Sequence, residues 1–171
     1  MEKEDIELFY KYLDNATNYL EYGSGGSTYQ AAQRENIKSI ISIESDEEWS
    51  NKIKNYTTLK YIDINSSPNS WGYPGNKATL ENIKLYSTSQ YTNQDMILID
   101  GRFRVACALK LWDHIHESTN VLFDDFNDRK QYHIVLDFFD VVEKGVKLIV
   151  LKKGKTKPSK RLIEYFELDP R

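Results

Sequence analysis

The chain has 171 residues and a mass of 20.0 kDa, the size of an ordinary single domain. Hydrophobic residues make up 40% and charged residues 29% of it, which excludes collagenous, disulfide-rich and disordered classes. The net charge of −3 gives no overall attraction for a polyphosphate, so nucleic acid is not expected as a partner. Cys107 has no second cysteine to pair with, the start of the chain is acidic, and no apolar stretch reaches the roughly 20 residues that span a bilayer. We expect a cytoplasmic protein without membrane insertion.

Apolar residues at helical spacing alternate with short apolar runs along the chain. The pattern predicts one domain over residues 1–171, with an N-terminal helix within residues 1–17 and a core over residues 18–171. Strands are predicted at residues 19–22, 39–44, 59–64, 96–99 and 121–123. Helices are predicted at residues 27–35, 46–54, 80–85, 105–112 and 135–142. Two last strands are predicted at residues 146–151 and 162–168, joined as an antiparallel pair by the basic segment 152–161.

Strands that alternate with helices predict an α/β fold with a mostly parallel sheet, covered on both faces, and ligands at the carboxyl ends of its strands. Seven strands with the last one antiparallel resemble the Rossmann-like three-layer sandwich of class I S-adenosylmethionine-dependent methyltransferases. The cofactor S-adenosylmethionine is what this resemblance implies.

A glycine-rich segment lies at the predicted turn from the first strand into the next helix. Glycine permits positive φ and lets a ligand approach bare backbone, and the helix start offers free N–H groups. A dinucleotide fingerprint that begins at Gly23 would need glycine at position 28, which is Thr28, so a nicotinamide-binding domain is disfavoured.

The acid two residues before this segment completes a second motif. Glu21, Gly23 and Gly25 resemble the first motif of the class I methyltransferases, in which the acid lies near the methionine ammonium. Ser27 stands where that family often has a further glycine. The resemblance implies cofactor contacts from Gly23, Ser24, Gly25, Ser27 and Thr28.

A second acid, Glu44, ends the second predicted strand, where a carboxylate can accept both ribose hydroxyls. The resemblance adds Ser45 beside it, with Trp49 as a wall one helical turn further on. The resemblance also places Asp63, at the end of the third predicted strand, near the adenine of the cofactor. Asp100, at the end of the fourth strand, completes the predicted cofactor-binding set.

Three aspartates end the fourth and fifth predicted strands. Because neighbouring strands lie about 4.8 Å apart, Asp100, Asp124 and Asp125 are expected to converge at one edge of the sheet. Oxygen ligands of this kind suit Mg²⁺, which would acidify a substrate hydroxyl. The two segments resemble metal-dependent sugar O-methyltransferases of the macrocin type, in which these positions bind the metal. Acids at such positions also serve as helix caps or occur in metal-free methyltransferases.

The base that the sugar enzymes carry two residues after the first metal ligand is absent. Arg102 stands at that position and cannot accept a proton. The metal, or one of the histidines at 114, 116 and 133, would then ionise the hydroxyl. The candidate catalytic residues are Asp100, Arg102 and Asp124.

The acceptor is expected to be a small molecule, and a sugar above all. Arg102 and Arg129 can clamp an anionic group such as a diphosphate, or can instead neutralise the aspartates. Trp71 and Tyr73, in the long loop 65–77, can stack on a sugar ring. We therefore expect O-methylation of a nucleotide sugar or glycan with magnesium assistance.

Two alternatives stay open at this point. One is a metal-free methyltransferase that acts on a small molecule or a protein side chain. The other is a non-catalytic cofactor-binding domain of a larger glycan-synthesis protein. The oligomeric state is open, with a homodimer as one outcome.

Overall fold

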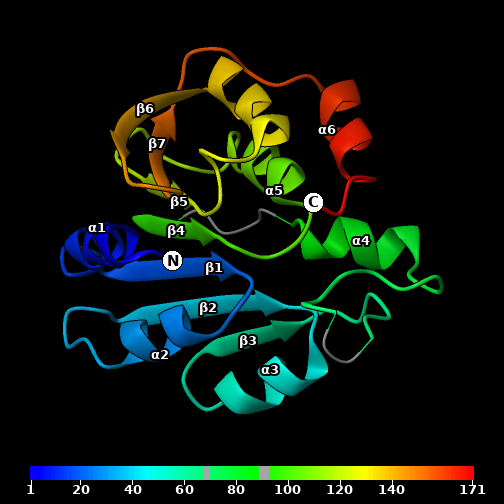
Figure 1. Cartoon of the computed structure of the whole chain (residues 1–171), viewed down its shortest axis with the longest axis horizontal. Coiled ribbons are helices and arrows are strands. Elements are labelled where there is room, and N and C mark those ends of the chain that lie inside the picture. Colours follow the sequence, from blue (N-terminus) through cyan, green and yellow to red (C-terminus); the bar gives the residue numbers. More distant parts are fainter. Residues whose placement is uncertain (68–69, 89–92) are drawn as a thin grey trace.

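A computed structural model describes residues 1–67, 70–88 and 93–171. In these residues seven strands form one sheet with the order β3-β2-β1-β4-β5-β7-β6 (Figure 1). The strands are β1 (Asn18–Tyr22), β2 (Ser39–Glu44), β3 (Thr58–Tyr61), β4 (Met96–Ile99), β5 (Asn120–Phe123), β6 (Phe139–Lys144) and β7 (Ile149–Lys153). Neighbours from β3 to β5 are parallel, and β7 is antiparallel to both β5 and β6. The predicted α/β fold, with its last strand antiparallel, is confirmed.

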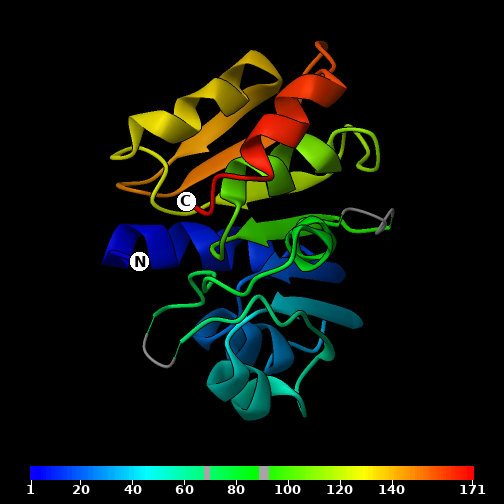
Figure 2. The same ribbon diagram turned by 90° about the vertical axis from the view of Figure 1, so that its right-hand side faces the viewer.

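Helices cover both faces of the sheet, as the second view makes clear (Figure 2). They are α1 (Lys3–Leu13), α2 (Gly26–Ala32), α3 (Glu47–Ile53), α4 (Leu80–Tyr86), α5 (Arg104–Leu111), α6 (Lys160–Phe166) and the 3-10 helix η1 (Lys130–Asp137). Side chains of β4 alternate between the faces: Leu98 packs with α1 and α2, whereas Ile97 packs with α4, α5 and η1. This alternation produces the three layers. No helix in the described part of the chain is both long and apolar enough to cross a membrane.

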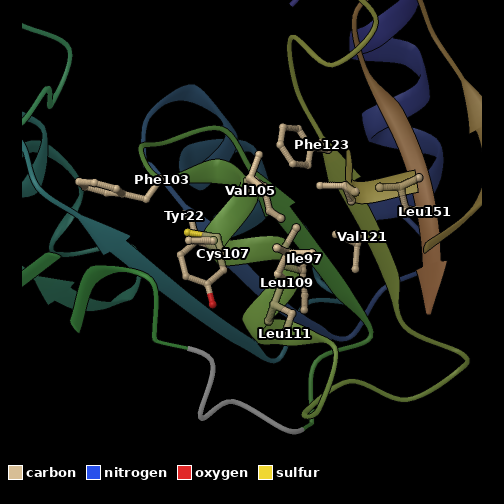
Figure 3. Close-up of a cluster of buried hydrophobic side chains, with 14 of the residues drawn as sticks. Tyr22, Ile97, Phe103, Val105, Cys107, Leu109, Leu111, Val121, Phe123 and Leu151 are labelled. Atoms are coloured by element: carbon tan, nitrogen blue, oxygen red, sulfur yellow. The ribbon is translucent and has the colours of Figure 1, made fainter. Parts of the chain in front are cut away.

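The larger core cluster is built around α5 (Figure 3). This helix is apolar on almost every side, and its buried residues pack between the sheet and α6. Cys107 is fully buried there, and burial raises the pKa of its thiol, which keeps the sulfur protonated and unreactive. The core therefore fixes the start of α5 directly beyond the carboxyl end of β4.

A buried carboxylate ties α1 to the far end of the chain. Asp5 is fully buried, and its carboxylate accepts backbone N–H groups of Val146 at 2.8 Å, Lys147 at 3.1 Å and Leu148 at 3.2 Å. These residues form the turn between β6 and β7. The N-terminal helix is thus held beside the carboxyl edge of the sheet and not left as a separate arm.

The predicted elements after residue 134 are wrong in part. The predicted helix 135–142 is replaced by the end of η1 and by β6, and the predicted strand 162–168 is the helix α6. β7 starts at Ile149, so the last antiparallel pair is the β6–β7 hairpin. Residues 152 and 153 end β7, and the rest of the basic segment leads into α6 without forming a hairpin turn.

Physical causes for both errors are visible. Gly145 lies in the turn between β6 and β7, where a Cβ would collide with the carboxylate of Asp5, and the β-branched residues Val141 and Val142 suit the strand before it. The hydroxyl of Ser159 caps α6 by accepting the N–H of Leu162 at 3.2 Å. Leu162 and Phe166, four residues apart, then face the same core.

The third strand is shorter than predicted, because β3 ends at Tyr61. The segment that follows crosses the side of the molecule to which the arrowheads of β1, β2 and β3 point (Figures 1 and 2). Residues 68 and 69 of the predicted loop 65–77 lie outside the described residues. Trp71 and Tyr73 lie within them.

Candidate cofactor and acceptor site

The glycine segment lies at the β1–α2 turn, as predicted, and brings two backbones into contact. Gly23 has a φ of +84°, and its N–H donates to the carbonyl of Ile43 at 2.8 Å. A Cβ at this position would lie 2.6 Å from both the nitrogen and the Cα of Gly101, in the turn after β4. Only glycine fits, and the ends of β1 and β4 are therefore fixed against each other.

Glu21 lies beneath this turn, fully buried. In the described residues its carboxylate accepts the hydroxyls of Tyr19 at 2.9 Å, Ser27 at 2.7 Å, Ser42 at 2.5 Å and, closer still, Thr28. Burial raises the pKa of Glu21, and these hydroxyl donors oppose that shift. Glu21 is not among the residues that line the cavity described below, so in this structure it holds the loop from behind.

Glu44 links the glycine loop to the start of α3. One carboxylate oxygen accepts both the N–H of Ser24 at 2.7 Å and its hydroxyl at 2.5 Å. The other oxygen accepts the N–H groups of Ser45 at 2.7 Å and Asp46 at 2.8 Å. The side chain is 5% exposed and lines the cavity. A ligand hydroxyl would reach Glu44 by replacing the hydroxyl of Ser24.

A cavity of about 770 Å³ opens at the carboxyl edge of the sheet. This is the size of a pocket for a drug-sized ligand. Its walls come from α1, the glycine loop, the ends of β2, β4 and β5, and the loop after β3. Of the predicted site residues, it is lined by Gly23, Ser24, Gly25, Ser27, Glu44, Ser45, Trp49, Trp71, Asp100, Arg102, Asp124, Asp125 and Arg129.

Some predicted residues lie outside the cavity lining. Thr28 is fully buried below the loop. Asp63 is exposed beyond the end of β3 and accepts the N–H of Asn65 at 2.7 Å. All three histidines are among the described residues and none lines the cavity; His133 lies 3.2 Å from the carbonyl of Phe126 and stacks on its ring.

The three predicted acids meet at one edge of the sheet around a buried arginine. Arg104 is 3% exposed, and its guanidinium donates to the carbonyls of Gly101 at 2.9 Å, Asp124 at 2.7 Å and Asp100 at 3.0 Å. It also forms ion pairs with the carboxylates of Asp100 at 3.2 Å and Asp125 at 3.3 Å. Asp125 is paired in addition with Arg129 at 2.8 Å. Asp100 and Asp125 are thus paired with arginines of the same chain.

This arrangement does not fit the predicted magnesium ion. In the parts of the chain that the structure describes, no three His, Cys, Asp or Glu side chains are grouped so that they could hold a metal. The guanidinium of Arg104 lies between the carboxylates that were predicted as ligands. The prediction of a metal site at Asp100, Asp124 and Asp125 is therefore not supported.

Burial changes the proton affinity of Asp100. Loss of hydration raises its pKa from 3.8 to about 7; Arg104 opposes the shift, and Asp124 and Asp125 add to it. Burial also raises the pKa of Asp124. The Oδ1 atom of Asp124 is buried and has no hydrogen-bond partner in the described residues. The pair can therefore accept a proton from a ligand in the cavity near neutral pH.

The predicted substrate residues surround Arg102. Its Nε donates to the carbonyl of Trp71 at 2.9 Å, and its guanidinium lies 5.9 Å from the ring centre of Tyr73. The Trp71 side chain is 77% exposed and lines the cavity, whereas Tyr73 is not part of the lining. Within the described residues Arg102 forms no ion pair, so its charge is available to a ligand.

Strained backbone is concentrated at this site. Trp71 and Asp125 line the cavity with φ values of 54° and 56°, and Phe103, between Arg102 and Arg104, has a φ of 51°. Each such conformation of a residue other than glycine costs about 1–3 kcal/mol and is typical of functional sites.

Sequence reasoning missed several contributors. Arg104 was not singled out, and Tyr86, whose buried hydroxyl accepts the N–H of Arg102 at 3.2 Å, was not assigned a role. The lining by the N-terminal segment was missed as well; it comes from Met1 and, in α1, from Ile6, Phe9 and Tyr10. A signal existed only for α1, whose apolar residues at helical spacing predicted the helix but not the cavity that it lines.

Comparisons with known proteins give the class of this fold. No protein-family model and no curated protein sequence matches the chain. Among solved structures, a methyltransferase-like protein from Silicibacter pomeroyi has 26% sequence identity and a TM-score of 0.85, and the match covers 99% of this chain and 96% of that one.

Two more distant structures share the fold. A candidate caffeoyl-CoA O-methyltransferase from Staphylococcus aureus has 18% identity and a TM-score of 0.55, with 90% of this chain and 85% of that chain covered. The N-methyltransferase NodS from Bradyrhizobium japonicum, in complex with S-adenosylhomocysteine, has 12% identity and a TM-score of 0.56, with 90% and 89% covered. The chain has the fold of the class I S-adenosylmethionine-dependent methyltransferases.

Proposed function

We propose that this protein is an S-adenosylmethionine-dependent methyltransferase that methylates a hydroxyl group of a small, anionic acceptor, with a sugar derivative as the leading class. One observation carries the proposal. A single cavity connects the glycine loop and Glu44 with the carboxylates of Asp100 and Asp124. Cofactor-binding features and a proton acceptor therefore face the same space.

The residues at the glycine-loop end fit this cofactor. Gly23 leaves the backbone bare, and Glu44 offers carboxylate oxygens at the position where such folds bind ribose. Trp49 lines the same part of the cavity and offers an aromatic wall. Once bound, S-adenosylmethionine would supply a methyl group made electrophilic by its positively charged sulfur.

At the other end of the cavity, the chain's own acids can take up the hydroxyl proton. Asp100 lines the cavity, and its ionised carboxylate can accept a hydrogen bond from the acceptor hydroxyl and then receive the proton. Below its pKa of about 7, Asp100 carries a proton and cannot act as a base. Activity should therefore rise with pH through about 7.

Arg102 and Trp71 support the choice of acceptor. The guanidinium of Arg102 lies at the cavity wall without an ion-pair partner in the described residues, and it suits a phosphate or carboxylate group. Exposed Trp71, fixed to Arg102 through its carbonyl, offers a ring for a sugar face. A nucleotide sugar presents both features.

The test is transfer of labelled methyl groups from S-adenosylmethionine to a panel of nucleotide sugars, sugar phosphates and their uncharged sugar analogues. We expect label on an anionic member, with a rate that rises between pH 6 and 8. Asp100→Asn should lower turnover by roughly 10²–10⁴-fold. Arg102→Gln should raise the acceptor KM more than it lowers kcat.

Asp113→Asn is the matched control, since Asp113 is paired with Lys157 outside the cavity. Unchanged turnover in Asp100→Asn would remove Asp100 as the base. Label on uncharged sugars at the same rate would remove the anionic requirement. Cofactor binding without transfer to any member of the panel would favour a non-catalytic binding domain.

A further inference from the structure

Arg104 holds the acid cluster together from inside the chain. It is the first residue of α5, and its side chain turns back between the ends of β4 and β5. Three carbonyl oxygens and two carboxylates surround the guanidinium, at the distances given above. The guanidinium also lies 5.9 Å from the ring centre of Tyr132, and all the hydrogen-bond and ion-pair partners described for it are oxygen atoms.

The charges around this point require a cation. Asp100, Asp124 and Asp125 carry three acidic groups within one small region, and like charges in such a place are unstable without compensation. Arg129 compensates Asp125 from the solvent side, with its side chain 40% exposed. Arg104 is the compensating charge in the interior, with its side chain 4% exposed. Arginine keeps its charge at every working pH.

We infer that Arg104 supplies the fixed positive charge that acids in this position otherwise obtain from a divalent metal, so that the site is complete without one. Arg104 is a positioning residue, because it orients the carboxylates of Asp100 and Asp125. The inference uses the acid cluster of the proposed active site but does not depend on methyl transfer. Its failure and the failure of the proposed function can therefore be told apart.

The environment of Arg104 leads to a specific consequence. Carboxylate and carbonyl oxygens are the ligands that hard divalent cations prefer. Removal of the guanidinium leaves these oxygens around an emptied, uncompensated space. A variant without the arginine should therefore acquire affinity for a divalent cation that the natural protein lacks.

Titration of the purified protein with Mn²⁺, followed by electron paramagnetic resonance of the free ion, tests this directly. The wild type is expected to bind no Mn²⁺ at its acid cluster, whereas Arg104→Ala should bind about one ion per chain. Arg104→Lys keeps a cation and should stay without the ion. The double variant Arg104→Ala with Asp125→Asn removes one of the carboxylates that surround the guanidinium and should lower the acquired affinity by at least roughly 10-fold.

If Arg104→Ala folds, is less stable than the wild type and binds no Mn²⁺, then Arg104 has a merely structural role. That result would overturn the inference. If Arg104→Ala does not fold, the wild type still decides. Stoichiometric Mn²⁺ binding by the wild type that Asp124→Asn abolishes would show a metal site and contradict the inference. Absence of such binding from the folded wild type supports it. Arg129→Gln is the control for loss of an exposed arginine from the same acids.

Discussion

Gly23→Ala should destabilise the protein by about 3 kcal/mol and remove cofactor binding with it. The residue has a φ of +84°, which costs an alanine roughly 1–2 kcal/mol. Its Cβ would also lie 2.6 Å from backbone atoms of Gly101, and overpacking of this kind costs about 1–3 kcal/mol. The neighbour is backbone and cannot rotate away, so the ends of β1 and β4 must separate. Urea unfolding followed by circular dichroism measures the loss.

The same loop contains its own control. Gly26 is the first residue of α2, and a Cβ there would meet nothing within 4 Å. Gly26→Ala should leave the free energy of unfolding unchanged or raise it by up to about 1 kcal/mol. Equal stability of the Gly23→Ala and Gly26→Ala variants would show that the β1–β4 contact does not have the geometry described.

Glu44→Gln should weaken binding of S-adenosylhomocysteine by about 1–3 kcal/mol, or roughly 5- to 150-fold. The amide would replace one carboxylate oxygen by an NH₂ group. That group would face N–H donors whichever way it turned, because Ser24 donates to one oxygen and Ser45 and Asp46 to the other. One acceptor for ribose hydroxyls is lost, and the glycine loop loses its tie to α3. Calorimetric titration measures the change.

Glu48→Gln is the matched control, because Glu48 lies in α3 close to Glu44 but is exposed and paired with Lys52 at 2.6 Å. Its affinity for S-adenosylhomocysteine should equal that of the wild type. If Glu44→Gln binds as tightly as Glu48→Gln, Glu44 has no part in the cofactor site.

The central part of the fold was predictable from the sequence because its signals are local. Of the parallel strands, β1, β2, β4 and β5 contain short apolar runs. The glycines that follow β1 and the acid that ends β2 are adjacent to these runs in the sequence. The C-terminal elements were not predictable in the same way. Short apolar segments such as Val141–Val142 and Leu162–Ile163 fit helix and strand equally well, and only pairing with β7 and packing on the core decide between them.

The acid cluster shows where local reasoning about the site ends. The sequence predicts Asp100, Asp124 and Asp125 at one edge, and they lie there. It pointed to Arg102 and Arg129 as the arginines that could neutralise them; Arg129 does pair with Asp125, but the second arginine is Arg104. The positive φ of Phe103 turns the chain so that Arg104 enters the interior and Arg102 faces the loop after β3. A rare backbone conformation of this kind has no signature in residue type. The position of α1 has no such signature either, because it depends on hydrogen bonds between the Asp5 carboxylate and the turn between β6 and β7, far away in the sequence.

The most direct test of the account is calorimetric titration of the purified protein with S-adenosylhomocysteine, repeated with NAD⁺ under the same conditions. We expect about one S-adenosylhomocysteine bound per chain and no binding of NAD⁺, because Thr28 stands where a dinucleotide-binding turn needs glycine. Absence of S-adenosylhomocysteine binding, or equal binding of NAD⁺, would contradict the assignment of the cavity as a site for this cofactor.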